Sequence, residues 1–77
     1  MTDIKLTGPQ IRVLRIAVSR RINYDIEHLQ AYYINVTEFL PARFLIEKGL
    51  VDQYSTYSII ANAAGVAWVA AHPEDKP

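Results

Sequence analysis

The apolar positions of this chain recur with periods that predict four helices and two short strands. Residues 8–19 follow the helical period, and Thr7 and Gln10 have the spacing of a capping box at the start of this helix. Its polar positions fall on one narrow face, which consists of Arg12, Arg15 and Ser19. A helix that is apolar over so wide an arc is expected to be central and to pack on more than one neighbour.

A second helix is predicted at residues 26–34, with Asp25 as its cap. Its apolar positions form one stripe that we expect to face the core, made of Ile26, Leu29 and Tyr33. The polar residues between them then point to solvent.

A third helix is predicted at residues 38–48, where Thr37 has the position of a cap. Pro41 falls at the end of its first turn, so the helix is expected to start a residue or two after Glu38. Gly49 follows and can end the helix with the positive φ that glycine adopts at little cost.

Two short strands and a last helix complete the pattern. Residues 51–54 and 57–60 are rich in Tyr, Val and Ile, which favour strands, and they are close enough in sequence to form a hairpin. Asn62 is the expected cap of a helix at 63–72, and Pro73 is expected to end it.

The 77 residues are enough for one domain with a modest core. We expect an N-terminal arm at 1–5, a domain at 6–72 and a polar tail at 73–77. The fold class is mainly α with a small β-hairpin. Among the five tyrosines, Tyr33 and Tyr57 are expected in the core and the other three half-buried.

Two local stretches are similar to segments of a known family. Residues 44–51 (FLIEKGLV) look like the end of a recognition helix that runs into the first strand of a wing. Residues 57–59 and 62–68 look like the second wing strand and the start of a last helix. The chain thus resembles the winged helix-turn-helix family, in particular its small bacterial or phage-type members. The resemblance implies three helices, a two-stranded wing and a C-terminal helix, with residues 38–48 in the major groove of DNA.

The charges that this resemblance would place on DNA cancel one another. The polar residues of the helix at 38–48 are two acidic and two basic, namely Glu38, Arg43, Glu47 and Lys48. The expected wing has no Arg or Lys, and the whole chain has eight basic and eight acidic residues. A DNA-binding surface usually has a basic excess, because neutralising phosphates supplies much of the affinity.

The same helix has an apolar pair, Leu40 and Phe44, on its outer side. On the opposite side lie its expected core residues, Phe39, Ala42, Leu45 and Ile46. An apolar pair ringed by charges is typical of a protein-binding hot spot, whereas base edges need hydrogen-bonding groups. The candidate partner-binding residues are therefore Leu40, Arg43, Phe44, Glu47 and Lys48. The alternative is that Leu40 and Phe44 are buried inside the domain.

The last helix has no charged residue between positions 63 and 71. Its larger side chains point in three directions and are Val66, Trp68 and Val69. A helix that is apolar on every side is buried on every side, and a domain of this size is too small to surround its terminal helix. We therefore expect self-association through these three residues, most simply as a symmetric homodimer. The alternative is that they are ordinary core.

Basic residues gather in and after the first helix. Together with two cations of the helix at 38–48 they are candidate phosphate contacts, namely Arg12, Arg15, Arg20, Arg21, Arg43 and Lys48. The alternative for the four arginines near the first helix is an ordinary solvated face.

Residue types needed for catalysis or metal binding are scarce. There is no cysteine, and Asp25 and His28 are too few ligands to make a metal site. No serine has the context of a nucleophile elbow, so no enzyme, cofactor or small-molecule substrate is expected. The longest apolar stretch is too short to span a bilayer and no signal-peptide pattern is present, so we expect a cytoplasmic location and no membrane partner.

Two functions fit these observations. The first is a non-enzymatic regulatory module, of inhibitor or adaptor type, that binds a protein partner and self-associates. The second is a dimeric transcriptional regulator that binds double-stranded DNA. The apolar outer side of the helix at 38–48 and the balanced charge favour the first.

Overall fold

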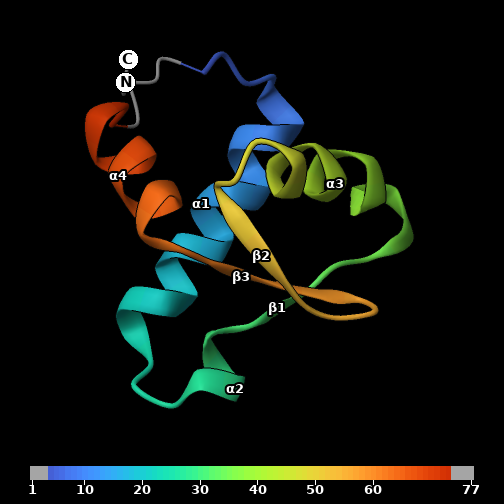
Figure 1. Ribbon diagram of the computed structural model, residues 1–77, viewed down its shortest axis with the longest axis vertical. Coiled ribbons are helices and arrows are strands. Elements are labelled where there is room, and N and C mark those ends of the chain that lie inside the picture. The colour runs from blue at the N-terminus through green and yellow to red at the C-terminus, as the bar shows by residue number, and fades with distance from the viewer. Residues whose placement is uncertain (1–3, 74–77) are drawn as a thin grey trace.

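The computed structural model describes residues 4–73, so residues 1–3 of the expected arm and 74–77 of the expected tail lie outside it. Four α-helices, one turn of 3-10 helix and a small antiparallel sheet make up this part of the chain (Figure 1). In chain order the elements are α1 (Gly8–Asn23), α2 (Glu27–Gln30), β1 (Tyr32–Tyr33), η1 (Val36–Glu38), α3 (Phe39–Glu47), β2 (Val51–Ser55), β3 (Ser58–Ala61) and α4 (Ala63–Ala71).

Helix α1 is central, as its wide apolar arc predicts. It begins after Thr7, whose backbone N–H donates a 3.0 Å hydrogen bond to Oε1 of Gln10. It contacts α2, α3, α4, β1 and β3, and Figure 1 shows it running behind both α3 and the sheet. Four of its side chains are fully buried, namely Val13, Leu14, Ala17 and Val18.

The sheet has three strands in the order β1-β3-β2, not the two strands of a simple wing. β3 pairs antiparallel with both neighbours, so that Ile59 lies between Tyr32 on one side and Gln53 on the other. The register of β2 is irregular between Gln53 and Ser55. The sequence predicted β2 and β3 to within a residue or so but not β1, because β1 is only two residues long.

The helix predicted at 26–34 is wrong in extent. α2 is a single turn, and its N-cap is Ile26 without a side-chain bond, so Asp25 does not cap it. The chain then extends, and the backbone N–H of Ile34 donates to the carbonyl of Tyr57 at 2.9 Å, which continues the pairing of β1 with β3. Pairing with a strand far along the chain thus overrides the local helical pattern. The expected inner stripe is consequently exposed, and its members are Ile26, Leu29 and Tyr33.

Helix α3 starts at Phe39, one residue after Glu38, as the position of Pro41 predicts. The 3-10 turn η1 precedes it, and Thr37 lies inside this turn instead of capping the helix. The capping role belongs to Asn35, whose N–H donates to Oε1 of Glu38 at 3.0 Å. Both ends of η1, the turn that leads into α3, are therefore fixed by local hydrogen bonds.

Asn62 connects the end of α3 to the start of α4. Gly49 ends α3 with a φ of 77°, and Asn62 Nδ2 donates to the Gly49 carbonyl at 2.9 Å. The Oδ1 atom of Asn62 accepts a 3.0 Å hydrogen bond from Gly65 N, which is the capping contact that the sequence predicts. α4 then runs to Ala71, shortly before Pro73.

One hydrophobic core lies between α1, the sheet, α3 and α4. Its largest fully buried side chains include Leu14, Leu45 and Ile59. Leu50, Val51, Ala61 and Trp68 close it on the side of α4. Within residues 4–73 no helix is both long and apolar enough to cross a bilayer.

Candidate protein-binding surface

Helix α3 has one buried face and one face that is largely exposed. Ala42 and Leu45 are fully buried, whereas the side of Leu40 is turned to solvent and the residue is 78% exposed. The prediction that Leu40 points away from the core is confirmed, and the alternative that it is buried inside the domain is wrong. We call Leu40, Arg43, Phe44, Glu47 and Lys48 the α3 outer face.

Phe44 is half-buried and forms the edge of this face. The Nζ atom of Lys48 lies 5.3 Å from the centroid of its ring, which is within the range of a cation–π contact. Leu40 and Phe44 lie one helical turn apart, so they form a short apolar ridge. Charged residues stand on both sides of this ridge.

The charges beside Leu40 are paired only weakly. Arg43 Nε lies 3.5 Å from Glu47 Oε2, and the two side chains are 76% and 62% exposed. The basic residue precedes the acidic one, which is the less favourable order on a helix. Exposed pairs of this kind contribute little to stability, so both groups can exchange partners readily.

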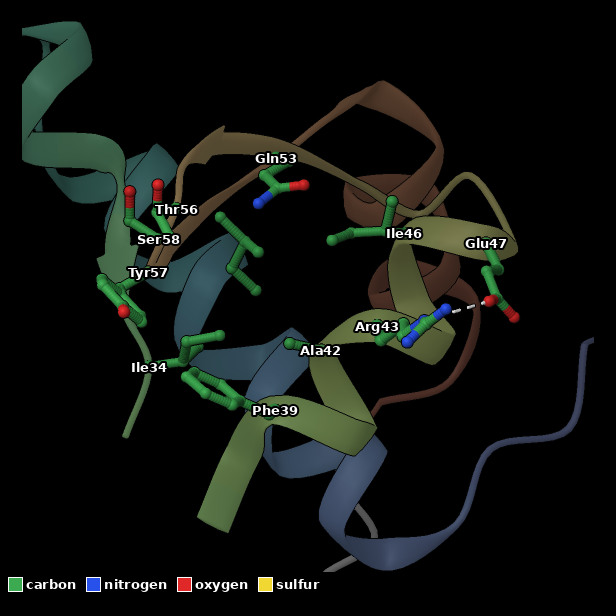
Figure 2. A pocket seen from close by; sticks show the side chains of 11 residues that line it. Ile34, Phe39, Ala42, Arg43, Ile46, Glu47, Gln53, Thr56, Tyr57 and Ser58 are labelled. Atoms are coloured by element: carbon green, nitrogen blue, oxygen red, sulfur yellow. Dashed lines mark ion pairs between the residues drawn. The ribbon is translucent and has the colours of Figure 1, made fainter. Parts of the chain in front are cut away.

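A groove lies between α3 and the sheet, on the other side of the Arg43–Glu47 pair from Leu40. Its volume is about 490 Å³. Figure 2 shows Phe39 and Tyr57 at one end and the Arg43–Glu47 pair at the other. The apolar residues that line it are Ile34, Phe39, Ala42, Ile46, Tyr57 and Ile59.

Two residues at this groove correct predictions from the sequence. Phe39 is partly exposed instead of buried, and its ring stacks on Tyr57 with centroids 5.8 Å apart. Tyr57 and Tyr33 were both expected in the core and are both exposed. Phe39 lines the groove between α3 and the strands, which a helical wheel for α3 alone does not show, and Tyr33 belongs to β1 instead of the predicted helix.

The groove offers a hollow with a mainly apolar lining. Its charged lining residues are Arg43 and Glu47, which face each other, and its neutral polar residues are Gln53, Thr56 and Ser58. Ser58 is buried and its hydroxyl lies 2.6 Å from that of Ser55. The arrangement suits an apolar side chain of a partner.

Three of the four arginines near α1 are committed to the fold. Nη2 of Arg15 donates to the His72 carbonyl at 2.8 Å, Nε of Arg20 to the Ala31 carbonyl at 3.0 Å, and Nη1 of Arg21 to the Ala61 carbonyl at 2.9 Å. These bonds join α1 to α4, to the segment before β1 and to the end of β3. Each of these three guanidinium groups thus has one contact within the fold, whereas Arg12 is exposed, and their role as phosphate contacts stays a prediction.

The large side chains of α4 lie mostly against the chain's own core. Trp68 is 7% exposed, and its Nε1–H donates to the carbonyl of Ile4 at 2.9 Å. The His72 ring stacks on it at 4.0 Å, and Val66 and Val69 pack partly against the core. This placement leaves Trp68 little surface for another chain, and the exposed side of α4 consists of Ala63, Ala64, Ala67, Ala70 and Ala71.

Tyr32 links β1 to η1 through a carboxylate. Its hydroxyl donates to Glu38, with both carboxylate oxygens at 2.9 Å. Burial raises the pKa of Tyr32, and the hydrogen bond to Glu38 and its negative charge raise it further. The phenol therefore remains protonated and keeps this link at neutral pH.

A second group of exposed apolar side chains surrounds α2. Ile22 and Ile26 are more than half exposed, and Tyr24 and Leu29 are partly exposed. Figure 1 shows α2 at the bottom of the molecule, well away from α3 and α4. The sequence did not reveal this group because the predicted longer helix placed two of its members in the core.

Metal-binding chemistry is also tested by the geometry. Residues 4–73 contain no group of three or more His, Cys, Asp or Glu side chains that could hold a metal ion.

The observed order of the elements matches the order implied by the family resemblance only in part. A helix that ends at Gly49, a β2–β3 hairpin and a helix capped by Asn62 follow one another as expected. The short α2 and the additional strand β1 depart from the expected order. Comparison of the chain with family models, with curated proteins and with solved structures finds no match in any of the three.

Proposed function

We propose that this chain is a non-enzymatic regulatory binding module that uses a winged-helix-like scaffold to bind a protein partner. The α3 outer face is the surface that makes the contact, as in an inhibitor or adaptor. The observation that carries the proposal is Leu40, a large aliphatic side chain in the first turn of α3 that is 78% exposed.

The arrangement around Leu40 supports this reading. Burying a leucine side chain contributes roughly 1.5–3 kcal/mol, which makes Leu40 a suitable central anchor. Charged residues at its rim, Arg43, Glu47 and Lys48, can exclude water and fix the orientation of the partner. The apolar groove beside Arg43 extends the surface that a partner can cover.

The alternative, a dimeric DNA-binding regulator, receives less support from the charges. Arg15, Arg20 and Arg21 already donate to backbone carbonyls. The cations of the described part without a bond to a carbonyl are Lys5, Arg12, Arg43 and Lys48, and Arg43 faces Glu47. With eight basic and eight acidic residues the chain has no overall attraction to a polyanion.

The substitution Leu40→Asp tests the proposal. Leu40 contacts mainly solvent, so the free energy of unfolding should change by less than about 0.5 kcal/mol. Partner capture should be lost, because a carboxylate would be desolvated within the contact. The measurement compares proteins from the native host that wild type and Leu40→Asp retain, followed by titration of the purified partner.

Val36→Asp is the matched control, because Val36 is equally exposed but lies on η1, outside the α3 outer face. It should retain the partner. Equal capture by Leu40→Asp and wild type would overturn the proposal, and so would tight, salt-sensitive binding of duplex DNA that Leu40→Asp leaves unchanged.

A further inference from the structure

We propose that the protein bound at the α3 outer face is a second copy of this chain, with the two α3 helices antiparallel across a two-fold axis. This inference rests on the proposed function, because it names the occupant of the same surface. It differs from the expected self-association through α4, whose central residue Trp68 is buried in the single chain.

The first argument is the self-complementarity of the charges on α3. In an antiparallel pair with the two-fold axis at the level of Leu45, position 43 of one copy lies opposite position 47 of the other. Arg43 and Glu47 therefore meet twice across the axis, in two equivalent ion pairs. Both side chains are well exposed and their contact within one helix is long, so this exchange of partners costs little.

The second argument is the position of the apolar residues in the same register. Phe44 lies next to the axis, so the two Phe44 rings meet at the centre of the interface. Leu40 lies about two residues, or ~3 Å along the helix, from the level of Lys48 of the other copy, whose aliphatic part can reach over the most exposed large hydrophobic side chain of the described part. Apolar contacts at the centre and charges at the rim are the usual arrangement of a protein interface.

The third argument is the net charge. The chain has eight basic and eight acidic residues, so two copies approach without net repulsion. A surface that binds an unrelated protein does not need to be self-complementary. Charged residues of one sign around its apolar centre would serve equally well. The alternating signs at Arg43, Glu47 and Lys48 favour a partner with the same sequence.

The test is complementation between two charge reversals, Arg43→Glu and Glu47→Arg. In either variant alone, like charges lie opposite each other across the axis, and we expect the dimer dissociation constant to rise about tenfold or more. In an equimolar mixture, position 43 of one variant and position 47 of the other again carry opposite charges. A heterodimer should therefore form in preference to either homodimer.

Mixing separates contact between copies from effects within one helix. Each variant keeps its own repulsion between positions 43 and 47 in the mixture, so only a contact across the interface can restore binding. Native mass spectrometry distinguishes the heterodimer by mass, and sedimentation equilibrium gives the dissociation constants. Thermal unfolding of each variant confirms that it is folded.

The outcomes separate this inference from the proposed function. Wild type that stays monomeric at about 1 mM, or a mixture that forms no heterodimer, overturns the second copy as occupant. A dimer that persists in Leu40→Asp also overturns it, because association then uses another surface such as the residues around α2. If Leu40→Asp loses a different protein while wild type is monomeric, the proposed function stands and the homodimer is wrong.

Discussion

At the scale of single residues, Gly65 decides how closely α4 approaches the rest of the fold. A Cβ at this position would overlap the carbonyl oxygen of Leu50 and would lie 3.2 Å from Cδ1 of Leu14. The carbonyl belongs to the backbone and cannot turn aside as a side chain can. The close approach of α4 to Leu50, and with it the placement of Trp68, depends on glycine here.

We expect Gly65→Ala to lower the free energy of unfolding by about 1–3 kcal/mol, the usual cost of inserting a methyl group into a packed site. Urea unfolding measures the loss. Gly8→Ala is the matched control, because a Cβ at Gly8 meets nothing within 4 Å. Equal stability of the two variants would show that α4 can shift without cost.

At the scale of elements, α1 is joined to its neighbours by guanidinium groups as well as by apolar packing. Arg20 donates to the carbonyl of Ala31, a residue that is almost completely buried, and its guanidinium lies 5.2 Å from the ring centroid of Tyr24. Loss of the donor costs more free energy when the acceptor is buried than when water can replace the donor. This bond therefore holds the segment between α2 and β1 against α1.

We expect Arg20→Gln to lower the free energy of unfolding by about 1 kcal/mol, because the Ala31 carbonyl loses a charged donor. Arg12→Gln should change it by less than about 0.5 kcal/mol, since Arg12 is exposed and makes no hydrogen bond or ion pair with another residue in the range 4–73. Chemical denaturation of both variants checks the difference. A similar loss of stability in both variants would mean that removing a positive charge, and not breaking this hydrogen bond, lowers the free energy of unfolding.

The elements that were predicted correctly have local signals. Gln10, Gly49 and Asn62 act within a few residues of their own position, so the sequence indicates where α1 starts, α3 ends and α4 begins. β1 was missed because its stability comes from β3, far along the chain.

The candidate site was likewise predictable only where a feature depends on the local sequence. The outward position of Leu40 follows from helical periodicity, and the structure confirms it. The groove does not follow, because it depends on how far β2 and β3 stand from α3. The bonds of Arg15, Arg20 and Arg21 were also missed, since their acceptors are backbone carbonyls that any residue type provides.

At the scale of the whole molecule, charge balance sets what the chain attracts. Acidic and basic side chains are equal in number, and several of the basic ones are bound to carbonyls. Long-range attraction to nucleic acid needs a surplus of free cations on one face. We therefore expect shape and apolar contact to contribute more than long-range charge to the association proposed here.

We expect duplex DNA to bind more weakly than roughly 10 μM even at about 50 mM salt, because few phosphates can be neutralised. Fluorescence anisotropy over a salt series measures both the affinity and its slope. Arg12→Gln, which removes an exposed cation, should change the result little. Tight binding with a steep salt dependence would favour the transcriptional regulator instead.

The middle position of β3 also has a consequence for how the chain is made. β1 and β2 each pair with β3 and not with each other, yet β3 is the last of the three strands in the sequence. A nascent chain on the ribosome can form α1 early, but both outer strands wait for residues 58–61 to emerge. We infer that the sheet assembles late in synthesis, and that the unpaired strands are meanwhile the segments most open to chaperones.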